Sequence, residues 1–161
     1  MAGHFHDDLE AHDSFVIRPA QAGEAGSLSA LAMRSKAHWG YDQAFLEAVR
    51  PLLEFTEADL ARVPVYVLTD QGEAVGVYRL EGEPPRGVIE DLWLDPRLIG
   101  RGIGRRLFEH ALLTARELGF ESLLIESDPN AEGFYLAMGA VLVGERRSPS
   151  GRTLPLLRVA V

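Results

Sequence analysis

The stretch Asp95–Leu118, DPRLIGRGIGRRLFEHALLTAREL, decides the fold because it joins the end of a strand to a glycine-rich turn and a helix. Residues 87–94, directly before it, are rich in β-branched and large apolar side chains, and Pro96, which lacks a backbone N–H, ends the predicted strand. In the second half of the stretch, apolar residues recur at helical spacing, and Gly119 follows at the place of a left-handed helix C-terminus. The pattern therefore predicts a strand, a turn and an amphipathic helix in succession.

The turn in this stretch has the composition of an anion site. Gly100, Gly102 and Gly104 remove Cβ atoms where the helix begins, so that the N–H groups of its first turn are open to an anion such as phosphate. Four arginines lie in the same stretch, although the formal net charge of the chain is −8: Arg97, Arg101, Arg105 and Arg106. A tight turn with solvated arginines would have a similar composition, but the alternation of glycines among arginines favours a phosphate site.

Two common phosphate motifs do not fit the turn. A dinucleotide fingerprint that starts at Gly102 requires a third glycine where Leu107 stands, and no βαβ unit is predicted near residue 15. A P-loop requires Gly-Lys followed by Ser or Thr, and this tripeptide does not occur. Rossmann-type binding and nucleotide hydrolysis are therefore disfavoured.

Two motifs resemble those of the GNAT superfamily of acyl-CoA-dependent N-acetyltransferases. Residues 99–104, IGRGIG, are similar to the family's Arg/Gln-x-x-Gly-x-Gly/Ala signature, with Ile99 where the family usually has Arg or Gln. Residues 128–140, DPNAEGFYLAMGA, are similar to its Asn-x-x-Ala-x-x-Phe/Leu-Tyr-x-x-x-Gly-Phe segment, with Asp128 for Asn and Ala140 for Phe. The two motifs lie in the second half of the chain, and the first half resembles the family only in the order of its elements.

The resemblance implies an N-acetyltransferase that moves an acetyl group from acetyl-CoA to a primary amine of a small molecule or to an exposed protein amine. The chain has no cysteine for a thiol intermediate, which favours direct attack in a ternary complex, and no metal is implied. The alternative is a non-catalytic acyl-CoA-binding sensor or interaction domain. The positions that the resemblance assigns to the cofactor are Leu92, Trp93, Leu94, Ile99, Gly100, Arg101, Gly102, Ile103, Gly104, Arg105, Asp128, Ala131 and Phe134.

The resemblance also implies catalytic roles. Tyr135 occupies the family's tyrosine position, where the phenol protonates the departing coenzyme A thiolate; packing on the sheet is the alternative. Glu90 is the candidate base, and it faces the side of its strand opposite to Asp91. Either acid could instead hold a cationic acceptor, His38 is also titratable near neutral pH, and Glu126 lies on the neighbouring strand, so the base is left open. The positions predicted to bind the acceptor are His38, Trp39, Tyr41, Asp91 and Glu126.

The remaining elements complete an α/β (α+β) fold with a mixed central sheet flanked by helices. Strands are expected at residues 15–20, 63–69, 73–80, 87–94, 122–127, 140–144 and 153–159, and helices at about 20–36, 42–50, 54–62, 103–118 and 130–138. A helix connects residues 87–94 to residues 122–127, which predicts that these two strands are parallel. In the family that the chain resembles, such a pair splays apart and admits the pantetheine arm.

Length and composition fit one domain. A chain of 161 residues, 47% of them hydrophobic, can bury a single core, which we assign to residues 15–161; residues 1–14 have the composition of a flexible tail. The net charge of −8 argues against nucleic acid as a partner and suits a cationic acceptor. The absence of cysteine and of a long apolar run predicts a cytoplasmic protein with no membrane partner. A homodimer is left open.

Overall fold

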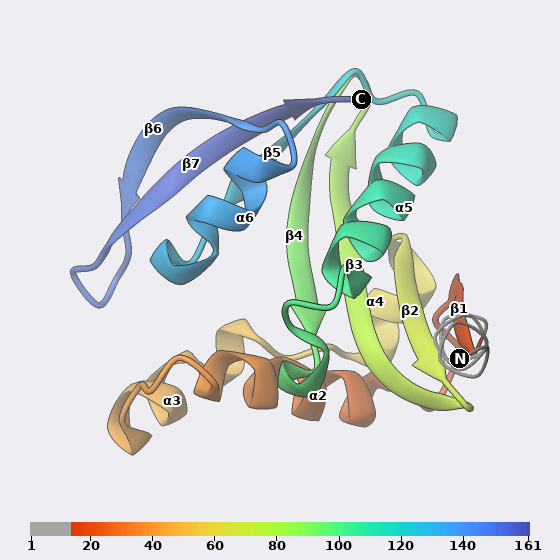
Figure 1. Ribbon diagram of the computed structural model, residues 1–161, viewed down its shortest axis with the longest axis horizontal. Helices are drawn as coiled ribbons and strands as arrows, with labels where there is room; N and C mark the ends of the chain where they lie inside the picture. The colour runs from red at the N-terminus through yellow and green to blue at the C-terminus, as the bar shows by residue number, and fades with distance from the viewer. Residues whose placement is uncertain (1–13) are drawn as a thin grey trace, which may run out of the picture. The chain divides into compact units, whose positions relative to one another are not determined.

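The structure is a computed structural model that describes residues 14–161. The tail predicted for residues 1–14 therefore lies outside the described residues, except for Ser14. Over the described residues, the strands form one seven-stranded mixed sheet in the order β1-β2-β3-β4-β5-β7-β6 (Figure 1). The mixed sheet with flanking helices that the sequence predicts is confirmed.

The elements have the following bounds: β1 Phe15–Pro19, α2 Ala25–Ala37, α3 Gln43–Val49, η1 Arg50–Leu52, α4 Glu57–Arg62, β2 Val65–Asp70, β3 Glu73–Glu83, β4 Arg86–Leu94, η2 Pro96–Leu98, α5 Ile103–Glu117, β5 Ser122–Glu126, η3 Pro129–Ala131, α6 Glu132–Ala137, β6 Val141–Arg147 and β7 Thr153–Ala160. None of the helices in this described part combines the length and the apolar character needed to cross a membrane.

The chain divides into two compact units. The first contains the described residues up to Val77 together with Trp93–Leu107, and the second contains Tyr78–Leu92 and Phe108–Val161. The strands β3 and β4 and the helix α5 each contribute residues to both units. Each unit is described by itself below.

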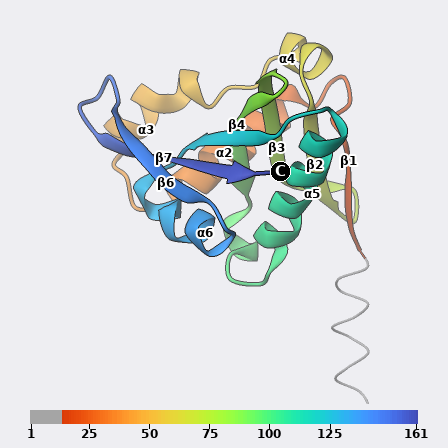
Figure 2. The same ribbon diagram turned by 90° about the horizontal axis from the view of Figure 1, so that it is seen from above.

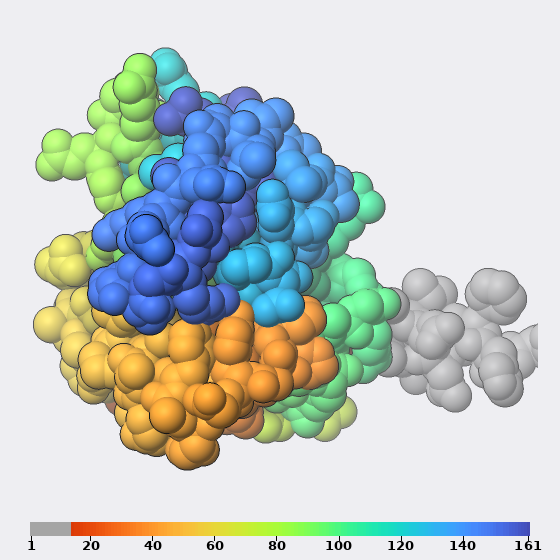
Figure 3. Space-filling view, turned by 90° about the vertical axis from the view of Figure 1, so that its left-hand side faces the viewer, coloured from red at the N-terminus to blue at the C-terminus, as the bar shows by residue number. Residues whose placement is uncertain are grey.

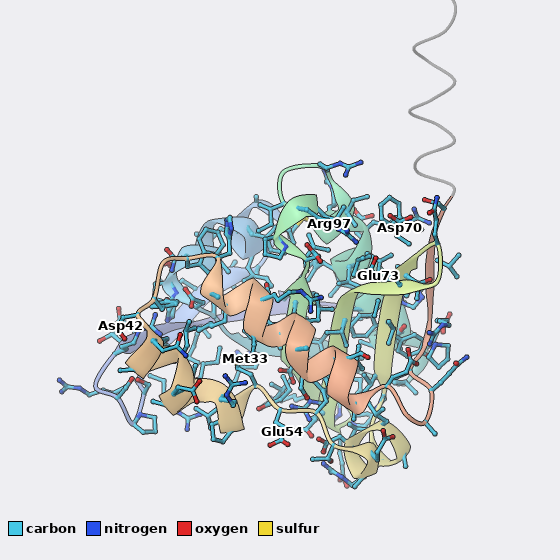
Figure 4. The ribbon with its side chains drawn as sticks, turned by 90° about the horizontal axis from the view of Figure 1, so that it is seen from below. Met33, Asp42, Glu54, Asp70, Glu73 and Arg97 are labelled. Atoms are coloured by element: carbon cyan, nitrogen blue, oxygen red, sulfur yellow. The ribbon has the colours of Figure 1, made fainter. Side chains whose placement is uncertain are left out.

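The core of the first unit lies between α2 and the strands β2 and β3. Leu28, Leu31 and Ala32 are fully buried on one face of α2, at the spacing that the sequence pattern predicts. They pack in one cluster with apolar residues from the strands, among them Val67 and Val77. In Figure 4, α2 lies across these strands. Burial of this stripe holds the helix on the sheet.

Helix α2 begins at Ala25, five residues later than expected. The residues before it are held in a turn by contacts of Glu24 with Arg18 and Gln21. The Glu24 carboxylate accepts bonds from the Arg18 guanidinium at 2.8 and 2.9 Å and from the Gln21 N–H at 2.6 Å. Gly23 takes a left-handed conformation with φ 93°. The segment before Ala25 is therefore a turn tied to β1.

The strands β2 and β3 form a hairpin, and its turn consists of Gln71 and Gly72. Both residues have positive φ, 50° and 84°, as a type I′ turn requires. Helix α4 begins at Glu57, after a capping box in which Thr56 and Asp59 exchange side-chain to backbone bonds.

The second unit contains the predicted parallel strand pair. Pairing between β4 and β5 runs from Arg86 opposite Ser122 to Ile89 opposite Ile125, and β4 continues to Leu94 beyond the last paired residue. Strand β7 lies between β5 and β6 and is antiparallel to both, as Figure 2 shows for β6 and β7. The sequence pattern did not predict this insertion.

Gly87 allows close packing in the second unit, beside the start of the parallel pair. A Cβ atom on this glycine would lie 2.6 Å from the Phe120 ring and 3.0 Å from the Leu123 side chain. Any larger residue would displace the ring, because contacts this short do not occur for real Cβ atoms. Gly87 therefore makes room for Phe120, which lies between α5 and β5 in the chain.

Candidate functional site

The glycine-rich loop in the first unit connects β4 to α5 as the sequence predicts. The Asp95 carboxylate accepts a bond from the Arg97 N–H at 3.1 Å and so begins the short helix η2. Gly100 and Gly102 then take left-handed conformations with φ 81° and 79°. The first helical hydrogen bond of α5 runs from the Arg106 N–H to the Gly102 carbonyl at 3.3 Å, so the N–H groups of Ile103 and Gly104 precede it.

The loop has the open space that an anion needs. A Cβ atom built on Gly100 or on Gly102 would meet no atom within 4 Å. A side chain at either position would be strained by the left-handed backbone and would occupy that space. This geometry fits the pyrophosphate of a coenzyme A thioester, which would lie against the amides at the start of α5.

The loop arginines have two different surroundings. Arg97 forms ion pairs with Glu73 at 3.3 Å and with Asp95 at 3.7 Å, and Figure 4 shows Arg97 and Glu73 near one another. Arg106 donates to the Phe15 carbonyl at 3.1 Å. Arg101 and Arg105 are exposed. Ile99, at the position where the family usually has Arg or Gln, is 41% exposed.

The strand residues predicted to pair with the cofactor are all half-buried: Leu92 in the second unit and Trp93 and Leu94 in the first. They lie on the part of β4 that extends past its pairing with β5. Trp93 packs against the apolar cluster of the first unit. Its role toward a cofactor stays a prediction.

Tyr135 is buried on α6 in the second unit, with 6% of its surface exposed. Its ring contacts Phe108 at a centroid distance of 5.7 Å and Phe134 at 5.2 Å. Burial raises the pKa of the phenol, and the carboxylates of Asp91 and Asp128 raise it further. A phenol in these surroundings remains protonated at neutral pH, which a proton donor requires.

Glu90 and Asp91 face opposite sides of β4, as the alternation along a strand predicts. Glu90 is exposed, but protein atoms displace part of the water around its carboxylate, and this desolvation raises its pKa. The negative charges of Glu81, Asp91 and Glu126 act in the same direction, and Arg79 opposes them. A carboxylate with a raised pKa is a better base near neutral pH than an ordinary one.

Asp91 forms a buried ion pair with Arg79. The Arg79 Nε donates to the Asp91 Oδ2 at 2.7 Å, and the two side chains are 9% and 3% exposed. The sequence analysis assigned no role to Arg79, although an arginine within the otherwise apolar run Val75–Leu80 is a signal of a buried charge. Binding of an acceptor by Asp91 stays a prediction, and the structure adds that Arg79 already holds its carboxylate.

Four further predicted residues lie in the second unit. The Glu126 carboxylate accepts a bond from Arg146 at 2.9 Å. The Asp128 carboxylate accepts from the Asn130 N–H at 2.8 Å and so forms the cap of η3, which an aspartate can do as well as an asparagine of the same length. Ala131 and Phe134 are half-buried, and the Phe134 ring lies edge-on to Phe108 at 6.0 Å.

The segment predicted to bind the acceptor lies in the first unit, between α2 and α3, and reaches the surface in the orange part of Figure 3. Trp39 is 39% exposed, and its ring meets the His38 ring edge-on at 4.8 Å. Tyr41 packs on Phe45 with ring centroids 4.3 Å apart. The structure thus groups the glycine loop and this segment in the first unit and Tyr135, Glu90, Asp91, Glu126 and Asp128 in the second. Among the described residues, no cluster of three or more His, Asp or Glu side chains could hold a metal ion.

Comparisons with known proteins identify the family. The family model described as "Acetyltransferase (GNAT) family" matches residues 30–140. Over 115 residues, the chain is 37% identical to the peptidyl-lysine N-acetyltransferase YjaB of Salmonella typhimurium, with 70% of this chain and 75% of that protein covered. It is 30% identical to YjaB of Escherichia coli over 146 residues, with 89% and 95% covered.

The fold agrees with solved structures of the same family. The PaiA N-acetyltransferase of Thermoplasma acidophilum, solved in complex with coenzyme A, superposes with a TM-score of 0.76 at 14% identity, with 92% of this chain and 99% of that chain covered. This structural likeness shows only a shared fold, whereas the sequence identity to the YjaB proteins shows the family relationship. The chain belongs to the acetyltransferase (GNAT) family and is an acetyl-CoA-dependent N-acetyltransferase.

Proposed function

We propose that the protein acetylates lysine side chains of other proteins. The observation that carries this proposal is the 30% identity to a peptidyl-lysine N-acetyltransferase across 89% of the chain. The charges of the second unit suit such an acceptor, because Glu81, Glu90 and Glu126 lie close enough to interact electrostatically. A lysine ammonium is attracted to a site of this charge.

The glycine loop would hold the diphosphate of acetyl-CoA. The amides of Ile103 and Gly104 begin α5, and Gly100 and Gly102 leave space for phosphate oxygens above them. The exposed guanidinium groups of Arg101 and Arg105 are suited to contact the same oxygens. Bound acetyl-CoA supplies the acetyl group as a thioester.

Glu90 would accept the proton that the lysine ammonium must lose before its nitrogen can attack. Its raised pKa keeps it able to take up a proton near neutral pH, directly or through a water molecule. The neutral amine then forms the C–N bond, its nitrogen gives its second proton to water, the bond between the carbonyl carbon and sulfur breaks, and the sulfur leaves as a thiolate. Direct attack is supported by the absence of cysteine from the sequence.

Tyr135 would deliver the proton that the thiolate needs. Its phenol is protonated because burial raises its pKa, and its ring is held by Phe108 and Phe134. The proton that Glu90 gained then returns to solvent, and the phenolate takes a proton from solvent before the next turnover.

The segment from His38 to Tyr41 would contact the acceptor side chain or the residues around it. An exposed indole beside a titratable ring is a common lining of ligand sites. The cytoplasmic location and the homodimer stay predictions; gel filtration with light scattering tests the second.

An acceptor panel tests the proposal. Peptides with a single internal lysine and a blocked N-terminus are incubated with acetyl-CoA, and free thiol release is followed together with the peptide mass. We expect turnover of lysine peptides and none of control peptides in which arginine replaces the lysine. Turnover of small amines without any turnover of lysine peptides would show that the acceptor class is wrong.

A further inference from the structure

Lys36 is the only lysine in the sequence, and it lies in an unusual place for a charged residue. It occupies the last position of the buried face of α2, after Leu28, Leu31, Ala32 and Ser35, and it is 8% exposed. A lysine at a core position is rarely buried to this extent unless another group compensates its charge. The structure therefore calls for a compensating contact.

Two aromatic rings face the Lys36 ammonium. Its Nζ lies 5.2 Å from the centroid of Tyr41 and 5.9 Å from the centroid of Phe45. These distances are within the range of cation–π contacts. The two rings also pack on each other in a tilted arrangement with centroids 4.3 Å apart, so one cation is shared by two rings in contact.

Helix α3, which carries Phe45, is attached at its C-terminal end, where Val49 packs against the apolar cluster of the first unit. None of the residues of α3, Gln43–Val49, is buried. Its N-terminus is capped by the Asp42 carboxylate, which accepts from the Phe45 N–H at 2.8 Å, but this bond is local to the helix. A helix of this length needs tertiary contacts for its stability. The contact of Lys36 with Tyr41 and Phe45 is such a contact.

We propose that Lys36 is a positioning residue for acceptor binding. By holding the rings of Tyr41 and Phe45, it fixes the segment from His38 to Asp42 and the first turn of α3 in the arrangement that receives the acceptor. The inference rests on the acceptor role proposed above for this segment.

The test compares Lys36→Gln, which removes the charge, with Lys36→Arg, which retains a cation able to lie over the rings. Arg50→Met is the matched control, because it removes a cation at the other end of α3, where Arg50 pairs with Glu47 in solvent. Hydrogen exchange of residues 42–49, the KM of the best acceptor, kcat and the Kd of coenzyme A are measured for each variant.

In Lys36→Gln we expect exchange at the first turn of α3 and the acceptor KM each to rise about tenfold, the size of effect expected when a partly desolvated cation–π contact is lost. The Kd of coenzyme A and kcat should change by less than about twofold, because the variant loses binding energy that the acceptor has equally in the ground state and in the transition state. Lys36→Arg should restore both quantities, and Arg50→Met should leave them unchanged.

Trp39→Ala separates this inference from the acceptor assignment. If Trp39→Ala leaves the acceptor KM unchanged, the segment does not bind the acceptor, and the positioning role fails with it. If Trp39→Ala raises the KM but Lys36→Gln does not, the acceptor assignment stands and the role of Lys36 is refuted, whatever happens to hydrogen exchange. A rise of KM in Lys36→Gln that Lys36→Arg does not reverse also refutes it, because the cation would not be the cause.

Discussion

Gly102→Ala provides a sharp test of the glycine loop, because the structure offers a control with the same backbone strain. Gly102 has φ 79° and Gly151, in the turn between β6 and β7, has φ 84°, and a Cβ on either would meet no atom within 4 Å. A left-handed conformation costs a residue with a Cβ about 1–2 kcal/mol. In a protein of this size, both variants should therefore melt about 2–8 °C lower than the wild type.

The two variants should differ in their affinity for coenzyme A. In Gly102→Ala the new methyl group occupies the open space at Gly102, the residue directly before α5. Loss of one hydrogen bond to a charged oxygen costs about 1.5–3 kcal/mol, so the Kd should rise at least about tenfold. At a concentration that is 100 times the wild-type Kd, coenzyme A stabilises the wild type by about 2.7 kcal/mol and would stabilise the variant by about 1.4 kcal/mol.

Calorimetric titration and thermal unfolding with and without coenzyme A measure these quantities. Gly151→Ala should keep the wild-type Kd and the full thermal shift. An unchanged Kd in a folded Gly102→Ala would refute the assignment of the diphosphate to this loop. An equal loss of affinity in both variants would show that backbone strain, and not the blocked space, is responsible.

Three further substitutions test the second unit. Tyr135→Phe keeps the ring and its aromatic contacts, so kcat should fall about a hundred- to ten-thousand-fold at an almost unchanged melting temperature; an unchanged kcat, with chemistry rate-limiting, would leave the tyrosine as a packing residue. In the wild type, kcat/KM should rise with pH as the base loses its proton, and because the pKa of Glu90 is raised, this rise should occur at a higher pH than for an ordinary glutamate. Glu90→Gln should abolish the rise. The same raised pKa means that wild-type stability falls as the pH rises through it, and this fall should be weaker in Glu90→Gln; an identical pH dependence would argue against the base. Arg79→Met removes the ion-pair partner of buried Asp91 and should lower the free energy of unfolding by about 3–5 kcal/mol, measured by urea unfolding; a change below 1 kcal/mol, by the same order-of-magnitude reasoning, would mean that the pair is not needed.

The parts of the fold that the sequence predicted are those set by neighbouring residues. The glycine loop, with the strand before it and the helix after it, depends on local backbone preferences and side-chain spacing, and it is confirmed. The start of α2 was wrong by five residues because Arg18 and Glu24, six positions apart, fix the preceding turn. Periodicity within the helix contains no information about such a contact.

In the candidate site, too, the features set by neighbouring residues were predicted, and the contacts between distant residues were not. The two motifs at residues 99–104 and 128–140 were visible because their residues are consecutive, and they were enough to indicate the family. The pair of Arg79 and Asp91 was not predicted, because it depends on how two different strands are aligned. The contact of Lys36 with Tyr41 and Phe45 was missed for a related reason, since a loop brings the rings back over the end of α2.

The position of β7 has a consequence for the synthesis of the protein. Thr153–Ala160 supplies the hydrogen-bonding neighbour of both β5 and β6, which are made earlier. While a ribosome is still translating the turn after Arg147, these two strands have edges that no later residue has yet covered. Unpaired edges favour contacts between chains. We expect nascent chains that stall before Thr153 to be the species most dependent on chaperones, and completion of β7 to end that dependence.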